Sequence, residues 1–194
     1  MKILVACEYS GRVRDAFTKR GHYAVSVDFL SSETEGDHIT GDVLDVIYQE
    51  HWDLMIAFPP CTDLAVSGAK WFAEKRADGR QQRALEFVRT LLDAPIQQIA
   101  LENPVGVIST YIRKPDQIVQ PYWFGHEATK TTCLWLKGLP PLMATSIVGK
   151  GERHITKSGR SLPKWYNLPP SPDRWKKRSL TYQGIADAMA NQWG

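Results

Sequence analysis

Residues 54–68 read LMIAFPPCTDLAVSG, an apolar run that ends abruptly in two prolines and a cysteine. A short, continuous apolar run bounded by prolines is typical of a strand that is buried on both faces of a sheet. Proline cannot donate a hydrogen bond to a β-ladder, so Pro59 and Pro60 end the strand and leave Cys61 at the rim of the sheet. The stretch therefore predicts a buried strand with a thiol just beyond its carboxyl end.

The segments on either side alternate between strand-like and helix-like patterns. In residues 11–21, for example, Val13, Ala16 and Phe17 share one helical face, and Gly21 is a candidate C-cap. Strands that alternate with helices indicate an α/β fold with a doubly wound, mostly parallel sheet. The expected strands are 2–7, 23–29, 52–58, 96–104 and 131–136, and the expected helices are 11–21, 42–51, 80–94 and 180–193.

The carboxyl ends of parallel strands are where α/β sheets bind ligands. If the predicted strands are parallel, the residues that follow them meet at one edge, and Cys61 faces Glu102 across a cleft. The groups expected at this edge are Cys7–Gly11, Asp28, Pro59–Cys61 and Glu102–Pro104.

Length and composition fit one ordinary globular domain. The chain has 194 residues, of which 43% are hydrophobic and 23% charged, as is usual for such proteins. The first apolar run is too short for a signal-peptide core or a membrane span, and the three cysteines lack the CxxC spacing of zinc or disulfide sites. We expect a single-domain cytoplasmic protein that binds no structural metal.

Charge is distributed unevenly along the chain. Residues 149–178 contain nine basic and two acidic side chains, which gives this segment a charge of +7 and leaves −4 for the remainder. Cations neutralise phosphates, and the aromatic residues among them, such as Trp175, can stack on bases. The segment is expected to form an extended loop or a small hairpin that contacts a nucleic acid, or else an ordinary solvated loop.

A thiol beside a carboxylic acid suits covalent activation of an electron-poor ring. A thiolate is the nucleophile, and an acid can protonate the ring atom on which negative charge accumulates. Of the three cysteines, Cys7 and Cys133 lie within apolar strand patterns and are expected to act as small buried hydrophobes. Cys61 and Glu102 are therefore the candidate reactive pair.

PPCTDLAVSG, residues 59–68, resembles the catalytic loop of the DNA cytosine-5 methyltransferases, and ENP, residues 102–104, resembles their Glu-Asn motif. The resemblance implies a Rossmann-like class I methyltransferase fold that uses S-adenosylmethionine. It also implies that Cys61 adds to C6 of cytosine, while Glu102, followed by Asn103, holds the ring and supplies a proton. A base inside a duplex has to be flipped out to reach such a site.

The resemblance extends to the cofactor half of the family. EYSG, residues 8–11, resembles its first motif, although Val13 and Arg14 stand where the family usually has further glycines. A carboxylate after the second strand can accept the ribose hydroxyls, and the ring of Phe29 can pack on adenine. Aspartates at such positions also commonly shape turns or cap helices. The implied cofactor contacts are Tyr9, Ser10, Gly11, Asp28, Phe29, Asp42, Val43, Phe58 and Pro59.

The substrate-facing motifs are matched less closely. Lys130 and Thr132 stand where the family has an Arg-x-Arg pair, and residues 66–80 correspond to its mobile, site-closing loop. A lysine meets a phosphate as a point charge but cannot reproduce a bidentate guanidinium contact. The expected DNA-binding residues are Ser67, Lys70, Arg153, Lys157, Arg160, Lys164, Lys176 and Lys177.

Only about forty residues separate the strand at 131–136 from the closing helix, which leaves little chain for a target-recognition domain. The sequence therefore predicts a compact, phage-type DNA cytosine-5 methyltransferase, working in a bacterial host or a phage-infected cell. Two alternatives are an enzyme with the same chemistry on a free cytosine nucleotide and a non-catalytic nucleic-acid-binding module. The closing helix is expected to be N-capped by Ser179 or Thr181.

Overall fold

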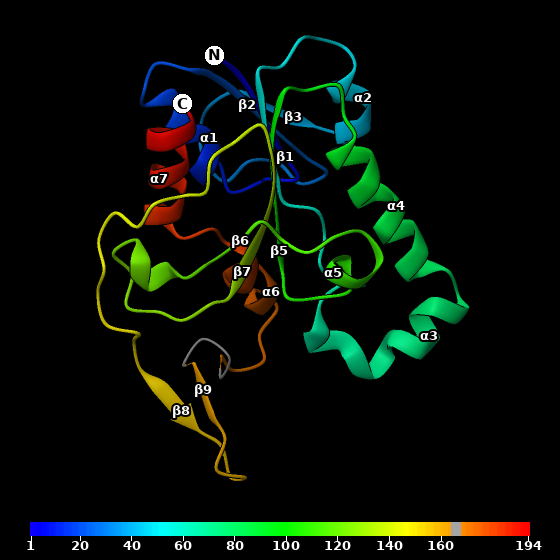
Figure 1. Cartoon of the computed structure of the whole chain (residues 1–194), viewed down its shortest axis with the longest axis vertical. Helices are drawn as coiled ribbons and strands as arrows, with labels where there is room; N and C mark the ends of the chain where they lie inside the picture. The colour runs from blue at the N-terminus through cyan, green and yellow to red at the C-terminus, as the bar shows by residue number, and fades with distance from the viewer. Residues whose placement is uncertain (164–167) are drawn as a thin grey trace.

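The computed structural model describes residues 1–163 and 168–194. Its centre is a seven-stranded sheet with the order β3-β2-β1-β4-β5-β7-β6 (Figure 1). The strands are β1 (Lys2–Ala6), β2 (Tyr23–Asp28), β3 (His38–Thr40), β4 (Leu54–Ala57), β5 (Gln98–Pro104), β6 (Gln117–Val119) and β7 (Thr132–Lys137).

Strands β1 to β5 run parallel to one another, whereas β7 is antiparallel to both of its neighbours, β5 and β6. The strand order reverses at β1, because the chain builds outward to β2 and β3 and then returns to place β4 on the other side of β1. The predicted α/β fold with a doubly wound, mostly parallel sheet is confirmed. Such a reversal is where α/β sheets open a crevice for ligands.

Helices cover both faces of the sheet (Figure 1). Successive side chains of a strand point to opposite faces, so each central strand contributes to two cores. Val5 and Ile56 pack with the helices of one face, and Met55 and Leu101 pack with those of the other. The first face carries α1 (Arg12–Thr18) and α7 (Gln183–Trp193), and the second carries α2 (Val43–Ile47), α4 (Arg80–Leu92) and α5 (Ile108–Tyr111).

Several short elements were not expected from the sequence. Residues 66–80, predicted as a site-closing loop, are helical over most of their length, forming the 3₁₀ helix η1 (Val66–Trp71) and α3 (Phe72–Ala77). A second 3₁₀ helix, η2, covers Pro121–Trp123. The residues Glu102–Pro104, which the sequence places at the end of the predicted strand 96–104, are the last residues of β5, because β7 pairs with them as far as Thr132.

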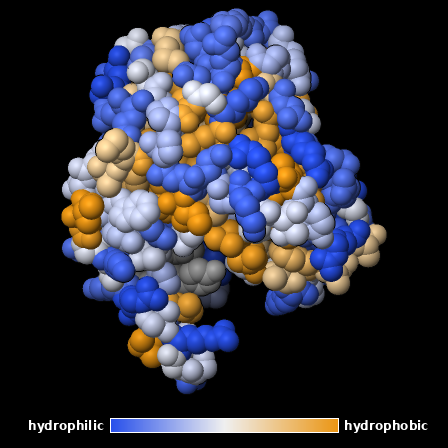
Figure 2. Space-filling view, viewed as in Figure 1, coloured by the Kyte–Doolittle hydropathy of each residue, from blue (hydrophilic) through white to orange (hydrophobic). Residues whose placement is uncertain are grey.

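The basic segment contains the predicted small hairpin, formed by β8 (Arg153–Ile155) and β9 (Ser161–Pro163). Figure 2 shows this hairpin standing away from the body, with the surface indented between it and the α3 side. The segment also contains a helix that was not expected, α6 (Arg174–Ser179). Most of the basic residues that the structure describes in this segment therefore lie on two separate elements.

The predicted N-cap of the closing helix is wrong. The N-cap position of α7 is Tyr182, whose side chain makes no capping bond. Instead, His126 Nε2 accepts a hydrogen bond of 2.8 Å from the backbone N–H of Gly184 in the first turn. The Ser179 hydroxyl bonds to Tyr9, so it is engaged elsewhere. His126, which is distant in the sequence, therefore accepts from a helix N–H group that the N-cap residue does not cap.

Arg14 is buried, with only 1% of its surface exposed, and its side chain bonds to several residues of another segment. Its guanidinium donates to the hydroxyls of Ser26 and Ser32, to the hydroxyl and carbonyl of Thr34 and to the carbonyl of Glu35. These bonds fix the loop between β2 and β3 against α1.

Among the described residues, no helix is both long enough and apolar enough to cross a membrane.

We expect Arg14→Ala to lower the free energy of unfolding by about 3 kcal/mol, because several buried hydroxyl and carbonyl groups lose their donor at once. Urea denaturation followed by circular dichroism measures this change. The matched control is Arg20→Ala, an exposed arginine just after the same helix, which should change stability by no more than about 0.5 kcal/mol. Equal effects of the two substitutions would contradict the role given to Arg14.

Candidate active site at the carboxyl edge of the sheet

Cys61 lies just beyond the carboxyl end of β4, as predicted, and is exposed. Phe58 continues the ladder with a backbone hydrogen bond of 2.9 Å to the carbonyl of Ala6. The carbonyl of Pro59 then accepts a bond of 2.8 Å from Asn103 Nδ2. The two prolines and this side-chain bond hold the thiol at the sheet edge.

The loop after Cys61 is fixed from two sides. The N–H of Val107 donates to the carbonyl of Leu64 at 2.9 Å, and a side chain at Gly106 would bring its Cβ within 2.2 Å of that oxygen. On the other side, the buried Lys75 of α3 contacts the carbonyl of Thr62 and lies 3.1 Å from the carboxylate of Asp63. Glycine at position 106 permits the close approach of the two chains.

Glu102 stands in β5, the strand next to β4, and its side chain is enclosed by Lys130 and Thr132. Burial raises the pKa of Glu102, while the positive charge of Lys130 and a hydrogen bond with the Thr132 hydroxyl lower it. Burial has the larger effect, so the pKa of the carboxyl lies above that of an exposed glutamate and its protonated form persists to higher pH. A protonated carboxyl can donate a proton to a substrate.

The thiol of Cys61 also resists ionisation. Partial desolvation raises its pKa, and so does the negative charge of Glu102, whereas the positive charges of Lys130 and Arg178 lower it. This electrostatic coupling places Cys61, Glu102 and Lys130 in one cluster, as the parallel strand ends predict. Both groups therefore ionise less readily than their exposed counterparts.

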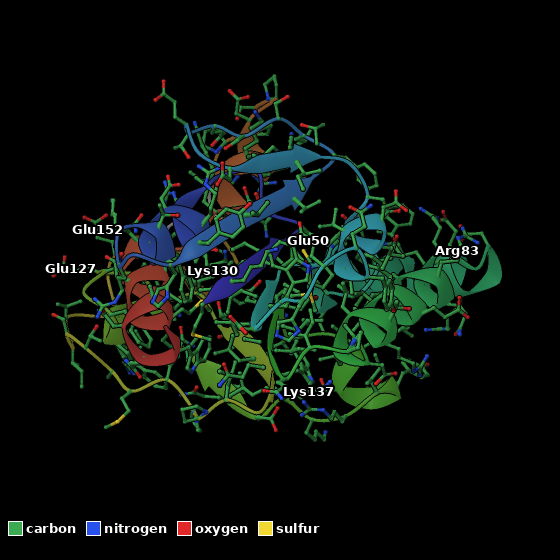
Figure 3. The ribbon with its side chains drawn as sticks, turned by 90° about the horizontal axis from the view of Figure 1, so that it is seen from above. Glu50, Arg83, Glu127, Lys130, Lys137 and Glu152 are labelled. Carbon is green, nitrogen blue, oxygen red and sulfur yellow. The ribbon has the colours of Figure 1, made fainter. Side chains whose placement is uncertain are left out.

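Lys130 connects this cluster to the basic segment. Its Nζ donates to the carbonyl oxygens of Arg178 at 2.9 Å and Leu180 at 3.3 Å. Figure 3 labels Lys130, just before β7, and Lys137 at the far end of that strand. Lys130 thus lies at the same edge as Cys61 and anchors the link between α6 and α7.

The loop after β1 is tightly ordered around a buried carboxylate. Glu8 accepts hydrogen bonds from the N–H groups of Val13 and Arg14 and from the hydroxyl of Ser10. Cys7, expected inside the strand, follows it with a left-handed φ of 58°, and burial raises the pKa of its thiol to about 12. The hydrogen bonds that Glu8 accepts, one of them from the backbone of Arg14, hold this loop in place without the further glycines that the family usually has.

The remaining predicted cofactor residues surround the end of β2. Asp28 is its last residue and accepts a 2.9 Å bond from the N–H of Leu30, and the neighbouring Phe29 is 74% exposed. Asp42 caps α2 through the N–H of Leu44, while the side chain of Val43 is 3% exposed and belongs to the core. Each aspartate uses one oxygen for local structure, and its second oxygen accepts none of these bonds.

A comparison with solved structures finds a similar chain, a crystal structure of a protein assigned as a DNA modification methyltransferase and encoded within a prophage of E. coli. The two chains superpose with a TM-score of 0.50 at 15% sequence identity, over 78% of this chain and 53% of the other. This is a methyltransferase fold. The chain covers about half the length of that protein. No family model and no curated protein matches the sequence.

The methyltransferase fold does not bring all the predicted DNA-binding residues together. Exposed Ser67 and Lys70 lie on η1, beside the site loop, whereas Arg153, Lys157 and Arg160 lie on the protruding hairpin. Arg153 also holds the hairpin together by donating to Ser161. Lys164 lies outside the described residues. The predicted residues on α6 are Lys176 and Lys177.

Helix α6 lies over the loop after β1. Tyr9 and Ser179 share a hydrogen bond of 3.0 Å between their hydroxyls, and the rings of Tyr9 and Trp175 are 5.9 Å apart. Lys176 is 3.5 Å from the carboxylate of Glu33, so part of its charge faces the protein. Sequence reasoning missed Arg178 as a neighbour of Cys61, because α6 has no apolar periodicity to reveal its position.

We expect the rate of alkylation of Cys61 by iodoacetamide to rise with pH through its raised pKa, since only the thiolate reacts. Lys130→Gln removes a charge that lowers the pKa, so the rate at pH 8 should fall by about three- to tenfold. Glu102→Gln removes a charge that raises the pKa, so the rate should increase by a similar factor. Peptide mass spectrometry reports the modified cysteine.

The matched control for this prediction is Lys70→Gln, which removes a lysine from η1 that is not among the charges acting on Cys61. Its alkylation profile should follow that of the unmodified protein. Shifts of the same sign for Lys130→Gln and Glu102→Gln would contradict the electrostatic cluster.

Proposed function

We propose that the protein is a DNA methyltransferase that transfers a methyl group from S-adenosylmethionine to C5 of cytosine through a covalent Cys61 adduct. The observation that supports it best is the electrostatic coupling of a thiol to a carboxyl of raised pKa at the ends of two adjacent parallel strands. The methyltransferase fold and the assignment of the similar prophage protein to DNA modification agree with this activity.

In the proposed reaction, Sγ of Cys61 forms a bond to C6 of cytosine while Glu102 holds N3 and delivers a proton to it. The electron density gained by the ring makes C5 nucleophilic. Later, loss of the C5 proton and release of Cys61 restore the aromatic ring, and Glu102 recovers its proton. Lys130 and Thr132 orient the Glu102 carboxyl throughout. Because the thiolate is the reactive form, Cys61 loses its proton to solvent water before Sγ bonds to C6, and the proton lost from C5 also passes to water.

S-adenosylmethionine, when bound, supplies the electrophilic methyl group. The residues around β1 and β2 fit it chemically, because a carboxylate at the end of β2 can accept ribose hydroxyls and an exposed aromatic ring beside it can cover adenine. Asp42, at the N-terminus of α2, offers a further acceptor. The backbones of Tyr9 to Gly11, Phe58 and Pro59 border the same edge, and the side chain of Val43 plays no part in binding.

We expect Asp28→Asn to weaken binding of S-adenosylmethionine by about tenfold, since an amide is a poorer acceptor for two hydroxyls than a carboxylate. Isothermal titration calorimetry measures the affinity. Asp37→Asn, an exposed aspartate in the following loop, is the control and should leave the affinity within about twofold. If the unmodified protein does not bind the cofactor, the proposed function fails.

A duplex that contains 5-fluorocytosine should trap the protein, because fluorine at C5 prevents the final loss of a proton. With S-adenosylmethionine present, intact-protein mass spectrometry should show a DNA adduct, and Cys61→Ser should abolish it. Cys133→Ala removes the buried thiol of β7 and should retain the adduct. Methyl label that enters dCMP, without any adduct on DNA, would instead favour the free-nucleotide enzyme.

A further inference from the structure

A small pocket lies where the start of α1 meets the link between α6 and α7, beside the candidate active site. It has a volume of about 150 Å³ and is lined by the start of α1, the approach to β7, the end of α6 and the link to α7. The described residues that line it are Arg12, Lys130, Lys177, Arg178, Leu180, Thr181 and Tyr182.

The pocket is strongly cationic. Four of its seven described lining residues are lysine or arginine, and none of the seven is acidic. Like charges that converge in a partly enclosed space repel one another, and an anion in that space turns the repulsion into attraction. The composition of the pocket therefore favours an anionic ligand.

Two of the cations are held in place by neutral backbone oxygens. Arg12 Nη1 donates to the carbonyl of Thr181 at 3.0 Å, and Lys130 donates to the carbonyls of Arg178 and Leu180. Carbonyl oxygens orient a cation without cancelling its charge. Lys177, by contrast, is exposed at the rim. The pocket is thus partly organised before any ligand arrives.

Size and position indicate which anion fits. Sites for whole drug-sized ligands enclose about 300–1,000 Å³, so a pocket of about 150 Å³ suits a single group such as a phosphate. Lys130 belongs both to this pocket and to the enclosure of Glu102, which puts the pocket next to the position of the target base. A phosphate attached to that nucleotide is the nearest anion that the substrate offers.

We propose that this pocket binds the phosphate group next to the target cytosine, with Arg12, Lys177 and Arg178 as phosphate-binding residues. The proposal rests on the proposed function for the identity of the base, and it assigns substrate positioning to α1 and α6. The hairpin is then left to make separate contacts. A phosphodiester of DNA and the monoester of a free nucleotide share the required chemistry.

The first test compares dCMP with deoxycytidine by isothermal titration calorimetry at low salt. If the source is a free nucleotide, dCMP should bind at least about tenfold more tightly than deoxycytidine. Arg12→Gln and Lys177→Gln should each remove most of that difference, leaving deoxycytidine unchanged. The control is Lys19→Gln, which removes one positive charge from an exposed position at the other end of α1.

The second test uses single-stranded oligonucleotides with one cytosine and one uncharged methylphosphonate link, placed on either side of it. If the source is DNA, one of the two neutral links should weaken binding to the unmodified protein by about tenfold, measured by fluorescence anisotropy. The same link should have little further effect on Arg12→Gln, and the slope of binding against salt should already be lower by about one in that variant.

The proposal is overturned if Arg12→Gln and Lys177→Gln show the same preference within each ligand pair as the unmodified protein does. It is also overturned if Lys19→Gln has the same effect as those variants. Both tests measure binding at equilibrium and need no turnover. Loss of the covalent adduct with phosphate dependence intact would refute the proposed chemistry alone. An intact adduct without phosphate dependence would refute the pocket alone.

Discussion

The parallel pairing of β4 with β5 is the constraint on which the candidate site depends. Their register places Ala57 opposite Leu101, and the bond from Asn103 to the carbonyl of Pro59 extends the contact past the end of β4. A slip of one residue would move Glu102 to the other face of the sheet, away from the thiol. The burial of both faces under helices makes such a slip costly, so the core maintains the spacing of the reactive groups.

Electrostatic competition sets the resting state of the site. Burial raises the pKa of both Glu102 and Cys61, and the negative charge of Glu102 raises the pKa of Cys61 further. The positive charge of Lys130 lowers the pKa of both groups. Its hydrogen bonds to two backbone carbonyls fix its position. A substrate that takes a proton from the site or adds negative charge to it therefore changes the ionisation of Cys61 and Glu102.

Much of the fold followed from the sequence, because central strands buried on both faces have continuous apolar runs and α4 has a clear helical period. The meeting of Cys61 with Glu102 followed from strand direction alone. By contrast, β3 and β6 have only three residues each, too few to show a period. Helix α6 is mostly cationic, so its contacts with Tyr9 and the contribution of Arg178 depend on tertiary docking, which no local pattern encodes.

The bond between Tyr9 and Ser179 joins residues that are 170 positions apart in the chain. A ribosome makes the loop after β1 long before α6, so the two surfaces cannot meet until the residues between them have been synthesised. Until α6 has been made, Cys61 lacks the charge of Arg178, one of the two positive charges that lower the pKa of its thiol.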